Sequence, residues 1–168
     1  MRTTCTPSSD PEAAVSVTVY RRFLDALNAH DLDTAATCVD LEHYEENCVG
    51  FTSGFVGWPA AASSLRKVWQ GIPDLHVDLV DVFGDDTTVL ARGTATGTNT
   101  GRLYGVPATR RAYRVVFFDS CRFRDGLIVR RVQHADVITQ MRQLYGRGVG
   151  TLGLLSSIVR VDPEAPSL

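Results

Sequence analysis

The feature that most constrains the fold is a pair of strand-like runs near the end of the chain. One run covers 112–124 and the other begins at Leu127, and both are rich in β-branched and aromatic residues. Asp125-Gly126 separates them, and an Asp-Gly pair between two such runs favours a tight turn. The sequence therefore predicts a long antiparallel hairpin in this region.

Two further strands are expected before this hairpin. Residues 75–83 alternate between apolar and polar side chains, which is typical of a half-buried antiparallel strand. After a turn at 84–86, the run 87–98 places small residues, including Gly93 and Gly97, on one face. Small residues in a strand favour curvature or the close approach of another group. The four strands together predict a curved antiparallel sheet.

The first half of the chain carries helical patterns. Apolar residues recur at three- and four-residue spacing from Asp10 to Ala29, and again over 59–70. Between them, Asp31 or Asp33 can cap a short second helix that runs through Val39. Helices that precede a run of strands indicate an α+β fold with three N-terminal helices on one face of the sheet. The stretch 41–52 is less clear and predicts a short strand or an irregular edge.

Length and charge limit the domain organisation and the partners. A chain of 168 residues with 44% hydrophobic residues fits one globular domain. We expect a leader at 1–9, the domain at 10–146 and an extension at 147–168 whose apolar residues pack on the sheet or on another subunit. The formal net charge of −2, with both signs interspersed, supplies no basic surface for nucleic acid or anionic membranes.

The four cysteines give no sign of a metal site. Cys5, Cys38, Cys48 and Cys121 are scattered, without the close spacing of zinc ligands. We interpret them as reduced thiols and predict no metal. We expect a soluble cytoplasmic protein, because no apolar run reaches membrane-spanning length.

Several segments resemble the SnoaL-like polyketide cyclases. The resemblance covers roughly residues 15–146 and lies in the segments 23–33, 71–75, 97–101, 105–111 and 122–128, and in the ending around 142–144. Together these motifs are specific for the family, although none is specific for one reaction. The resemblance implies a cone-shaped barrel of the nuclear transport factor 2-like (cystatin-like) type, without cofactor and assembled as a homo-oligomer, either dimer or tetramer.

The resemblance also implies a catalytic residue. In the cyclases of this family, an Asp at the end of the last strand is the acid/base for an intramolecular aldol ring closure, and Asp136 matches its position. The chain departs from the family in two places, since Arg130 and Val132 stand where members often have Glu and Trp. It also adds the extension beyond Gly146. These departures leave the acid/base in place and bear on the choice of substrate.

The predicted chemistry needs one carboxylate in an apolar surrounding. A carbon flanked by carbonyls is acidic enough for a carboxylate to deprotonate, and burial in the cone would raise the pKa of Asp136 toward neutrality. His134 has the same strand parity, so it is a candidate partner for the substrate or for Asp136. The alternative is that Asp136 only caps the following helix.

A second set of residues is predicted to contact the substrate. The set combines residues of the stretch 41–52 with aromatic and basic residues elsewhere: His43, Tyr44, Asn47, Trp69, Phe118 and Arg122. The sequence does not decide which face of the long strand Asp119 and Arg122 occupy. A core or interface position is the alternative for Trp69, and a solvated edge is the alternative for the group at 43–47.

The sequence therefore favours an enzyme that acts on a hydrophobic polyketide-type small molecule by acid/base catalysis. The same cone also suits isomerases, hydroxylases and epoxide-opening enzymes, so the fold does not decide the reaction. Epoxide opening would need two carboxylates and an Arg that holds a water between them, residue types that Asp119, Arg122 and Asp136 could supply. A ligand-binding or assembly module without catalysis is the remaining alternative.

Overall fold

The computed structural model describes residues 14–49, 54–103 and 107–146, and the predicted leader and extension lie outside these ranges. Its elements are α1 (Val15–Asn28), α2 (Leu32–Ala36), β1 (Glu45–Val49), β2 (Phe55–Val56), α3 (Trp58–Gly71), β3 (His76–Gly84), β4 (Thr88–Thr98), β5 (Ala112–Arg124) and β6 (Leu127–Ala135), and a last helix covers 137–146. The predicted α+β class is confirmed. No helix in the described part of the chain is both long and apolar enough to cross a membrane.

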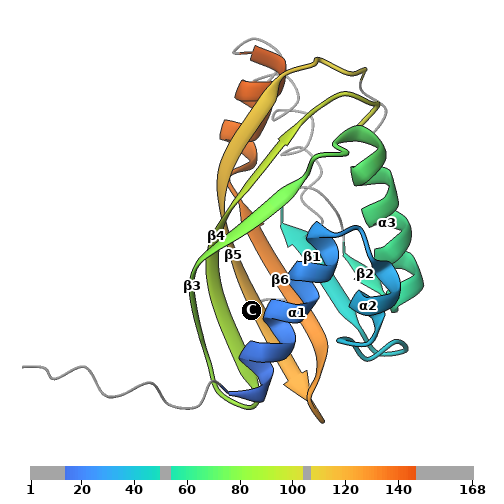
Figure 1. The fold of residues 1–168 in the computed structure, drawn as a ribbon, viewed down its shortest axis with the longest axis vertical. Coiled ribbons are helices and arrows are strands. Elements are labelled where there is room, and N and C mark those ends of the chain that lie inside the picture. Colours follow the sequence, from blue (N-terminus) through green and yellow to red (C-terminus); the bar gives the residue numbers. More distant parts are fainter. Residues whose placement is uncertain (1–13, 50–53, 104–106, 147–168) are drawn as a thin grey trace, which may run out of the picture.

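The strands form one six-stranded sheet in the order β2-β1-β6-β5-β4-β3 (Figure 1). From β3 to β6 every neighbouring pair is antiparallel, and the Asp125-Gly126 turn joins β5 to β6, as predicted. The strand β1 pairs in parallel with β6 and antiparallel with β2. The stretch 41–52 therefore contains an inner strand, which places alternate residues of β1 toward the interior.

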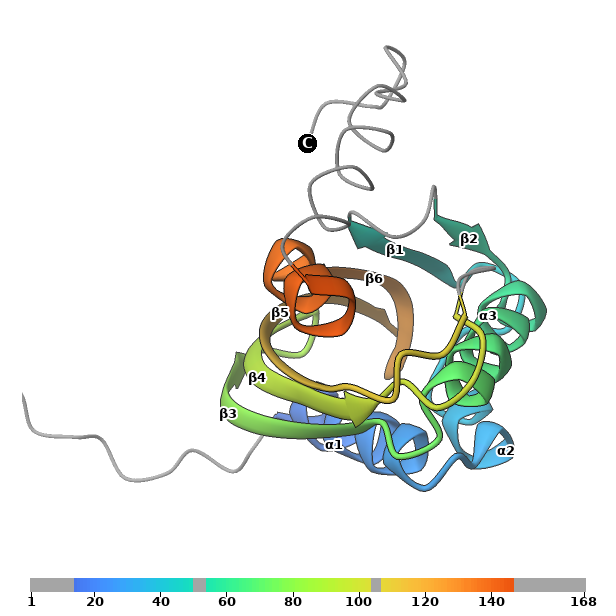
Figure 2. The ribbon, with the colours of Figure 1, turned by 90° about the horizontal axis from the view of Figure 1, so that it is seen from above.

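The sheet curls, and the helices close its open side. Viewed from above, β1, β6, β5, β4 and β3 follow an arc, and α1 and α3 lie across the opening of that arc (Figure 2). Neighbouring groups approach β4 closely at a glycine, which is one of the two alternatives that the small residues on β4 predict. A Cβ built on Gly93 would lie 2.5 Å from the carbonyl oxygen of Asp78 and 2.5 Å from the Phe117 ring. The strands can approach this closely only because Gly93 has no side chain.

We expect Gly93→Ala to lower the free energy of unfolding by about 1–3 kcal/mol, because the added methyl group meets backbone and a buried ring. Urea denaturation of the purified variant measures this loss. An unchanged transition midpoint would show that β4 can move away from its neighbours at no cost.

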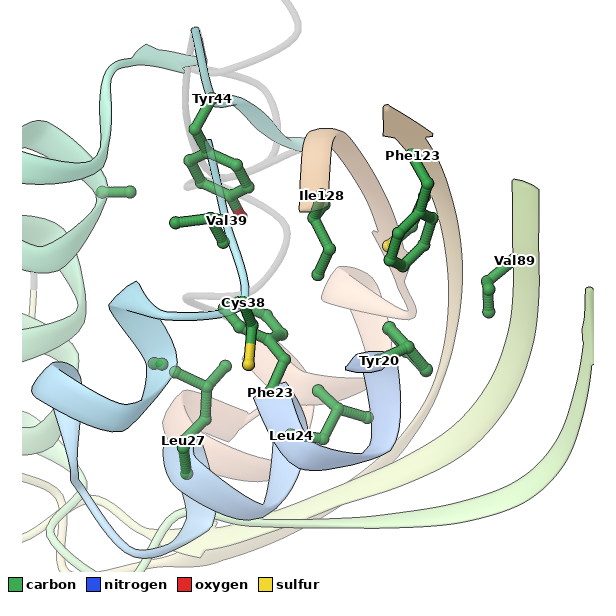
Figure 3. Packing of buried hydrophobic residues seen from close by; sticks show 14 of the residues in the cluster. Tyr20, Phe23, Leu24, Leu27, Cys38, Val39, Tyr44, Val89, Phe123 and Ile128 are labelled. Atoms are coloured by element: carbon green, nitrogen blue, oxygen red, sulfur yellow. The ribbon is translucent and has the colours of Figure 1, made fainter. Parts of the chain in front are cut away.

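The core lies between α1 and the concave face of the sheet. Figure 3 shows side chains from α1, from the connection before β1 and from the strands meeting there. Tyr20 and Phe23 of α1 are fully buried, as are Cys38 and Ile128. The one-sided apolar pattern of α1 thus faces the sheet, as its three- and four-residue spacing predicts.

The convex face of the sheet carries uncovered apolar side chains. Phe83, Leu90, Val116 and Phe118 are each about half exposed or more. Phe83 on β3 and Leu90 on β4 are register partners, and Val116 and Phe118 lie on β5, so exposed apolar side chains occur on all three strands.

Candidate active site

A pocket of about 140 Å³ lies between α3 and the concave face of the sheet. Its walls are mostly apolar, and they include Leu65, Trp69 and Phe117. A cavity of this volume holds a molecule about the size of one aromatic ring, so a larger substrate has to extend beyond it. A concave, apolar site with a few polar groups is the usual form of a small-molecule site.

The polar groups of the pocket gather on two neighbouring strands. Glu46 is the register partner of Arg131, and Cys48 is the register partner of Gln133, in the parallel pair β1 and β6. All four side chains line the pocket. Because alternate residues of a strand share a face, the two from each strand lie side by side on the inner surface.

Arg131 lies at the centre of a buried ionic network. Its Nη1 donates to Glu46 Oε1 at 3.0 Å, while its Nε and Nη2 donate to Asp119 Oδ2 at 3.0 Å and 2.8 Å. The Tyr20 hydroxyl donates to the same Asp119 oxygen at 2.7 Å. The side chains of Arg131, Glu46 and Asp119 are 4%, 5% and 0% exposed. Two carboxylates therefore hold one guanidinium, and the carboxylate that reaches the pocket is Glu46.

The electrostatics of the network keep its donors protonated. Burial alone would lower the pKa of Arg131, but the carboxylates of Asp119 and Glu46 raise it well above its ordinary value. Burial and then Asp119 raise the pKa of Tyr20, and burial and then Glu46 raise that of Tyr44. The hydroxyl of Tyr44 and Oδ1 of Asp119 are buried without a hydrogen-bond partner among the described residues.

Cys48 is a thiol that links the two strands. Its Sγ lies 3.6 Å from Glu46 Oε1 and 3.7 Å from Gln133 Oε1, and its single proton can be donated to either oxygen. Burial and the neighbouring Glu46 raise the pKa of Cys48 to about 12, so the thiol keeps its proton at neutral pH. It is a poor nucleophile in this state, because the thiolate is the reactive form.

Asp136 occupies a different environment from the predicted one. Its carboxylate is exposed and accepts a hydrogen bond from the backbone N–H of Thr139 at 2.9 Å, so it caps the helix 137–146. This hydrogen bond lowers the pKa of Asp136, and the predicted increase is therefore wrong. Neither Asp136 nor His134, which is also exposed, lines the pocket. A catalytic role for these two residues stays a prediction.

We expect Asp136→Ala to lower the free energy of unfolding by about 1 kcal/mol through loss of the cap, and Asp136→Asn to leave it unchanged because Asn caps equally well. Parallel urea denaturation curves of the two variants measure the difference. If both variants lost the same free energy of unfolding, Asp136 would not act as a helix cap.

The predicted substrate contacts are dispersed in the structure. Trp69 lines the pocket. Tyr44 is buried in the core beside Trp58, with ring centroids 5.8 Å apart, and His43 is exposed and contacts Asp40 at 3.1 Å. The remaining members of the set lie on the convex face or its rim and are exposed: Asn47, Phe118 and Arg122. Of these predicted residues, Trp69 alone is in a position to contact a ligand in this pocket.

Sequence reasoning missed the residues that form the polar wall. The strand β5 turns Phe117 and Asp119 inward, so Phe118 and Arg122 face outward. The partner of Asp119 is consequently Arg131 and not Arg122. One signal was available, since Glu46 and Arg131 are charged residues within strand-like stretches, and a buried charge requires a partner of opposite sign.

Among the described residues, no group of His, Cys, Asp and Glu side chains could hold a metal ion.

Comparison with known proteins identifies the family. The model of the SnoaL-like polyketide cyclase family matches residues 17–144, so the chain belongs to this family. Comparison with curated protein sequences gives no match.

Several solved structures share the fold. A protein from Jannaschia sp. CCS1 that is named after the same family is 16% identical, with a TM-score of 0.75 over 84% of this chain and 99% of that chain. TsrD from Streptomyces laurentii is 24% identical, with a TM-score of 0.70 over 82% and 100%. An LEH-like epoxide hydrolase from M. tuberculosis is 20% identical, with a TM-score of 0.65 over 87% and 98%. These likenesses establish the cone-shaped α+β fold.

Proposed function

We propose that this protein is a cofactor-independent acid/base enzyme that acts on a polyketide-type small molecule and uses Glu46 as its proton carrier. The observation that carries the proposal is the position of Glu46, whose buried carboxylate is fixed by Arg131 at the wall of an apolar pocket. Oε1 of Glu46 accepts the Arg131 hydrogen bond, and Oε2 accepts none from the described residues. One carboxylate oxygen is thus held while the other is available to a ligand.

The chemistry is that of an aldol ring closure. Glu46 removes a proton from a carbon beside a carbonyl group, and the electron pair of the broken C–H bond moves to the carbonyl oxygen to give an enolate. The enolate carbon then forms a C–C bond to a second carbonyl carbon of the same molecule. The resulting alkoxide takes the proton back from Glu46, so the carboxylate is regenerated.

The surroundings of Glu46 support a hydrophobic and uncharged substrate portion. Most of the lining residues are apolar, and the Arg131 guanidinium is already paired with two carboxylates. The exposed apolar surface on β3, β4 and β5 supports the proposed homo-oligomer, because patches of this kind often mark protein contacts.

Deuterium exchange into 2-indanone tests the proposed function. This compact ketone has enolisable protons, and its exchange in heavy water is followed by proton NMR. The wild-type protein should accelerate the exchange over the buffer rate, and the acceleration should saturate with ketone concentration. A rate equal to that of buffer, for this ketone and for a more acidic 1,3-diketone, would reject the acid/base proposal.

Epoxide opening is a second candidate, favoured by one observation. Arg131 bridges two carboxylates, those of Asp119 and Glu46, so the residue types that this reaction needs lie together. Water would attack an epoxide carbon while the ring C–O bond breaks, and Glu46 would pass the proton of the water to the ring oxygen. Incubation with styrene oxide in ¹⁸O-labelled water distinguishes the two candidates, since only this one yields a labelled diol faster than buffer alone does.

A further inference from the structure

Gln133 is the carboxamide closest in register to the Glu46 carboxylate. It lies on β6 two residues beyond Arg131 and opposite Cys48, and its side chain lines the pocket. Its Oε1 accepts the hydrogen bond from the Cys48 thiol at 3.7 Å. Its Nε2 donates no hydrogen bond to the described residues, so two N–H groups are available at the pocket wall.

The Cys48 thiol lies between this carboxamide and the proton carrier. The same sulfur lies within 3.6 Å of Glu46 Oε1 and 3.7 Å of Gln133 Oε1, so both side chains meet at one atom. A thiol is mainly a donor, and it therefore favours the amide orientation in which the oxygen faces the sulfur and the nitrogen faces away. The pocket wall consequently presents an acceptor and a donor as neighbours.

We propose that Gln133 is a catalytic residue whose Nε2 donates a hydrogen bond to the substrate carbonyl oxygen and stabilises the enolate that forms there. The inference rests on the proposed function and specifies how the same site handles the developing negative charge. In an enolisable ketone the oxygen and the reacting carbon are attached to the same carbonyl carbon. A donor and a base that act on this group therefore have to lie side by side, as Gln133 and Glu46 do.

Arg131 is not the donor for this oxygen. Its Nε, Nη1 and Nη2 all donate to the carboxylates of Asp119 and Glu46. Asn28 is also occupied, since its side chain exchanges two hydrogen bonds with the backbone of Val77 at 2.8 Å and 2.9 Å. Neutral amide donors are known to stabilise oxyanions in enzymes, and removal of one such donor lowers the rate on the order of 100-fold.

A matched pair of ligands tests the hydrogen bond without any reaction. The ketone 2-indanone and the alkene 2-methylideneindane have nearly the same shape, but only the ketone has an acceptor oxygen. Dissociation constants follow from quenching of tryptophan fluorescence, since Trp69 lines the pocket. In the Gln133→Met variant the ratio of the alkene constant to the ketone constant should fall about fivefold from its wild-type value. The ratio should stay unchanged in Gln70→Met, which alters an exposed carboxamide on α3 outside the pocket.

Each outcome decides the role of Gln133. A ratio that is the same in wild type and Gln133→Met overturns the proposal, as does the absence of saturable binding of either compound. In the exchange assay, Gln133→Met should lower the maximal rate on the order of 100-fold with a much smaller change in KM. A wild-type rate in Gln133→Met would contradict the catalytic role. If wild type itself gives no exchange, the proposed function fails, while the ligand ratio still decides whether Gln133 binds the oxygen.

Discussion

Replacement of Arg131 by Met is expected to lower the free energy of unfolding by about 3–5 kcal/mol. The side chain is 4% exposed and is the shared partner of Glu46 and Asp119. Without the guanidinium, Asp119 keeps only the Tyr20 hydroxyl, and two carboxylates stay buried with no charge to oppose them. Removal of one partner from a buried ion pair costs more than the pair itself contributes, because desolvation of the remaining charge is uncompensated. Urea denaturation measures the loss.

Arg130→Met is the matched control for this substitution. Arg130 is the neighbouring residue on β6, but its side chain is 56% exposed and its contact with Glu45 is 3.8 Å long. An exposed ion pair contributes at most about 1 kcal/mol, so we expect a change of that size or smaller. Equal effects in the two variants would show that the Arg131 network is not the stabilising element.

Replacement of Glu46 by Gln is expected to lower the rate of deuterium exchange into 2-indanone by about 100-fold or more. The amide is close to the carboxylate in shape and can still accept the hydrogen bond from Arg131, but it cannot take up a proton from carbon. The exchange rate is measured by proton NMR at saturating ketone. Binding of the ketone should change much less than the rate, since the pocket walls stay the same.

Glu45→Gln provides the control for this prediction. Glu45 precedes Glu46 on β1 but points to the opposite face, where its side chain is 57% exposed. We expect the exchange rate of this variant to equal that of wild type. A rate loss in both variants would indicate a general effect of charge on β1, and wild-type activity in Glu46→Gln would reject Glu46 as the proton carrier.

Local patterns were sufficient to predict most of the fold. The alternation in 75–83, the Asp125-Gly126 turn and the helical spacing of 59–70 each describe contacts between residues close in sequence. Such signals are read directly from the period of the apolar residues. The position of β1 is different, because it depends on pairing with β6, about 85 residues further along the chain. A short strand with two glutamates gives no local sign of a parallel partner.

The site was harder to predict for the same reason. Burial of Glu46 becomes intelligible only when Arg131 and Asp119 are seen beside it, and these three residues come from three different strands. Strand parity was also decisive on β5. A shift of one residue moves every side chain to the other face, so Phe117 lines the pocket while Phe118 is exposed.

The position of Asp136 shows how one sequence pattern serves two roles. An Asp between a strand and a helix is placed equally well for a cavity wall and for a helix cap. In the structure its carboxylate lies in solvent and accepts a hydrogen bond from the Thr139 N–H, and this hydrogen bond lowers its pKa. A base with a lowered pKa in water gains nothing from the apolar pocket, and this difference favours Glu46 as the proton carrier.

The measurement that tests this assignment most directly is the exchange rate of 2-indanone in Asp136→Asn and Glu46→Gln, determined side by side with wild type at the same pH. If Glu46 carries the proton, Asp136→Asn should retain the wild-type rate, and Glu46→Gln should lose about 100-fold or more. The reverse result, with exchange abolished in Asp136→Asn and retained in Glu46→Gln, would contradict the proposed site and return the proton transfer to Asp136.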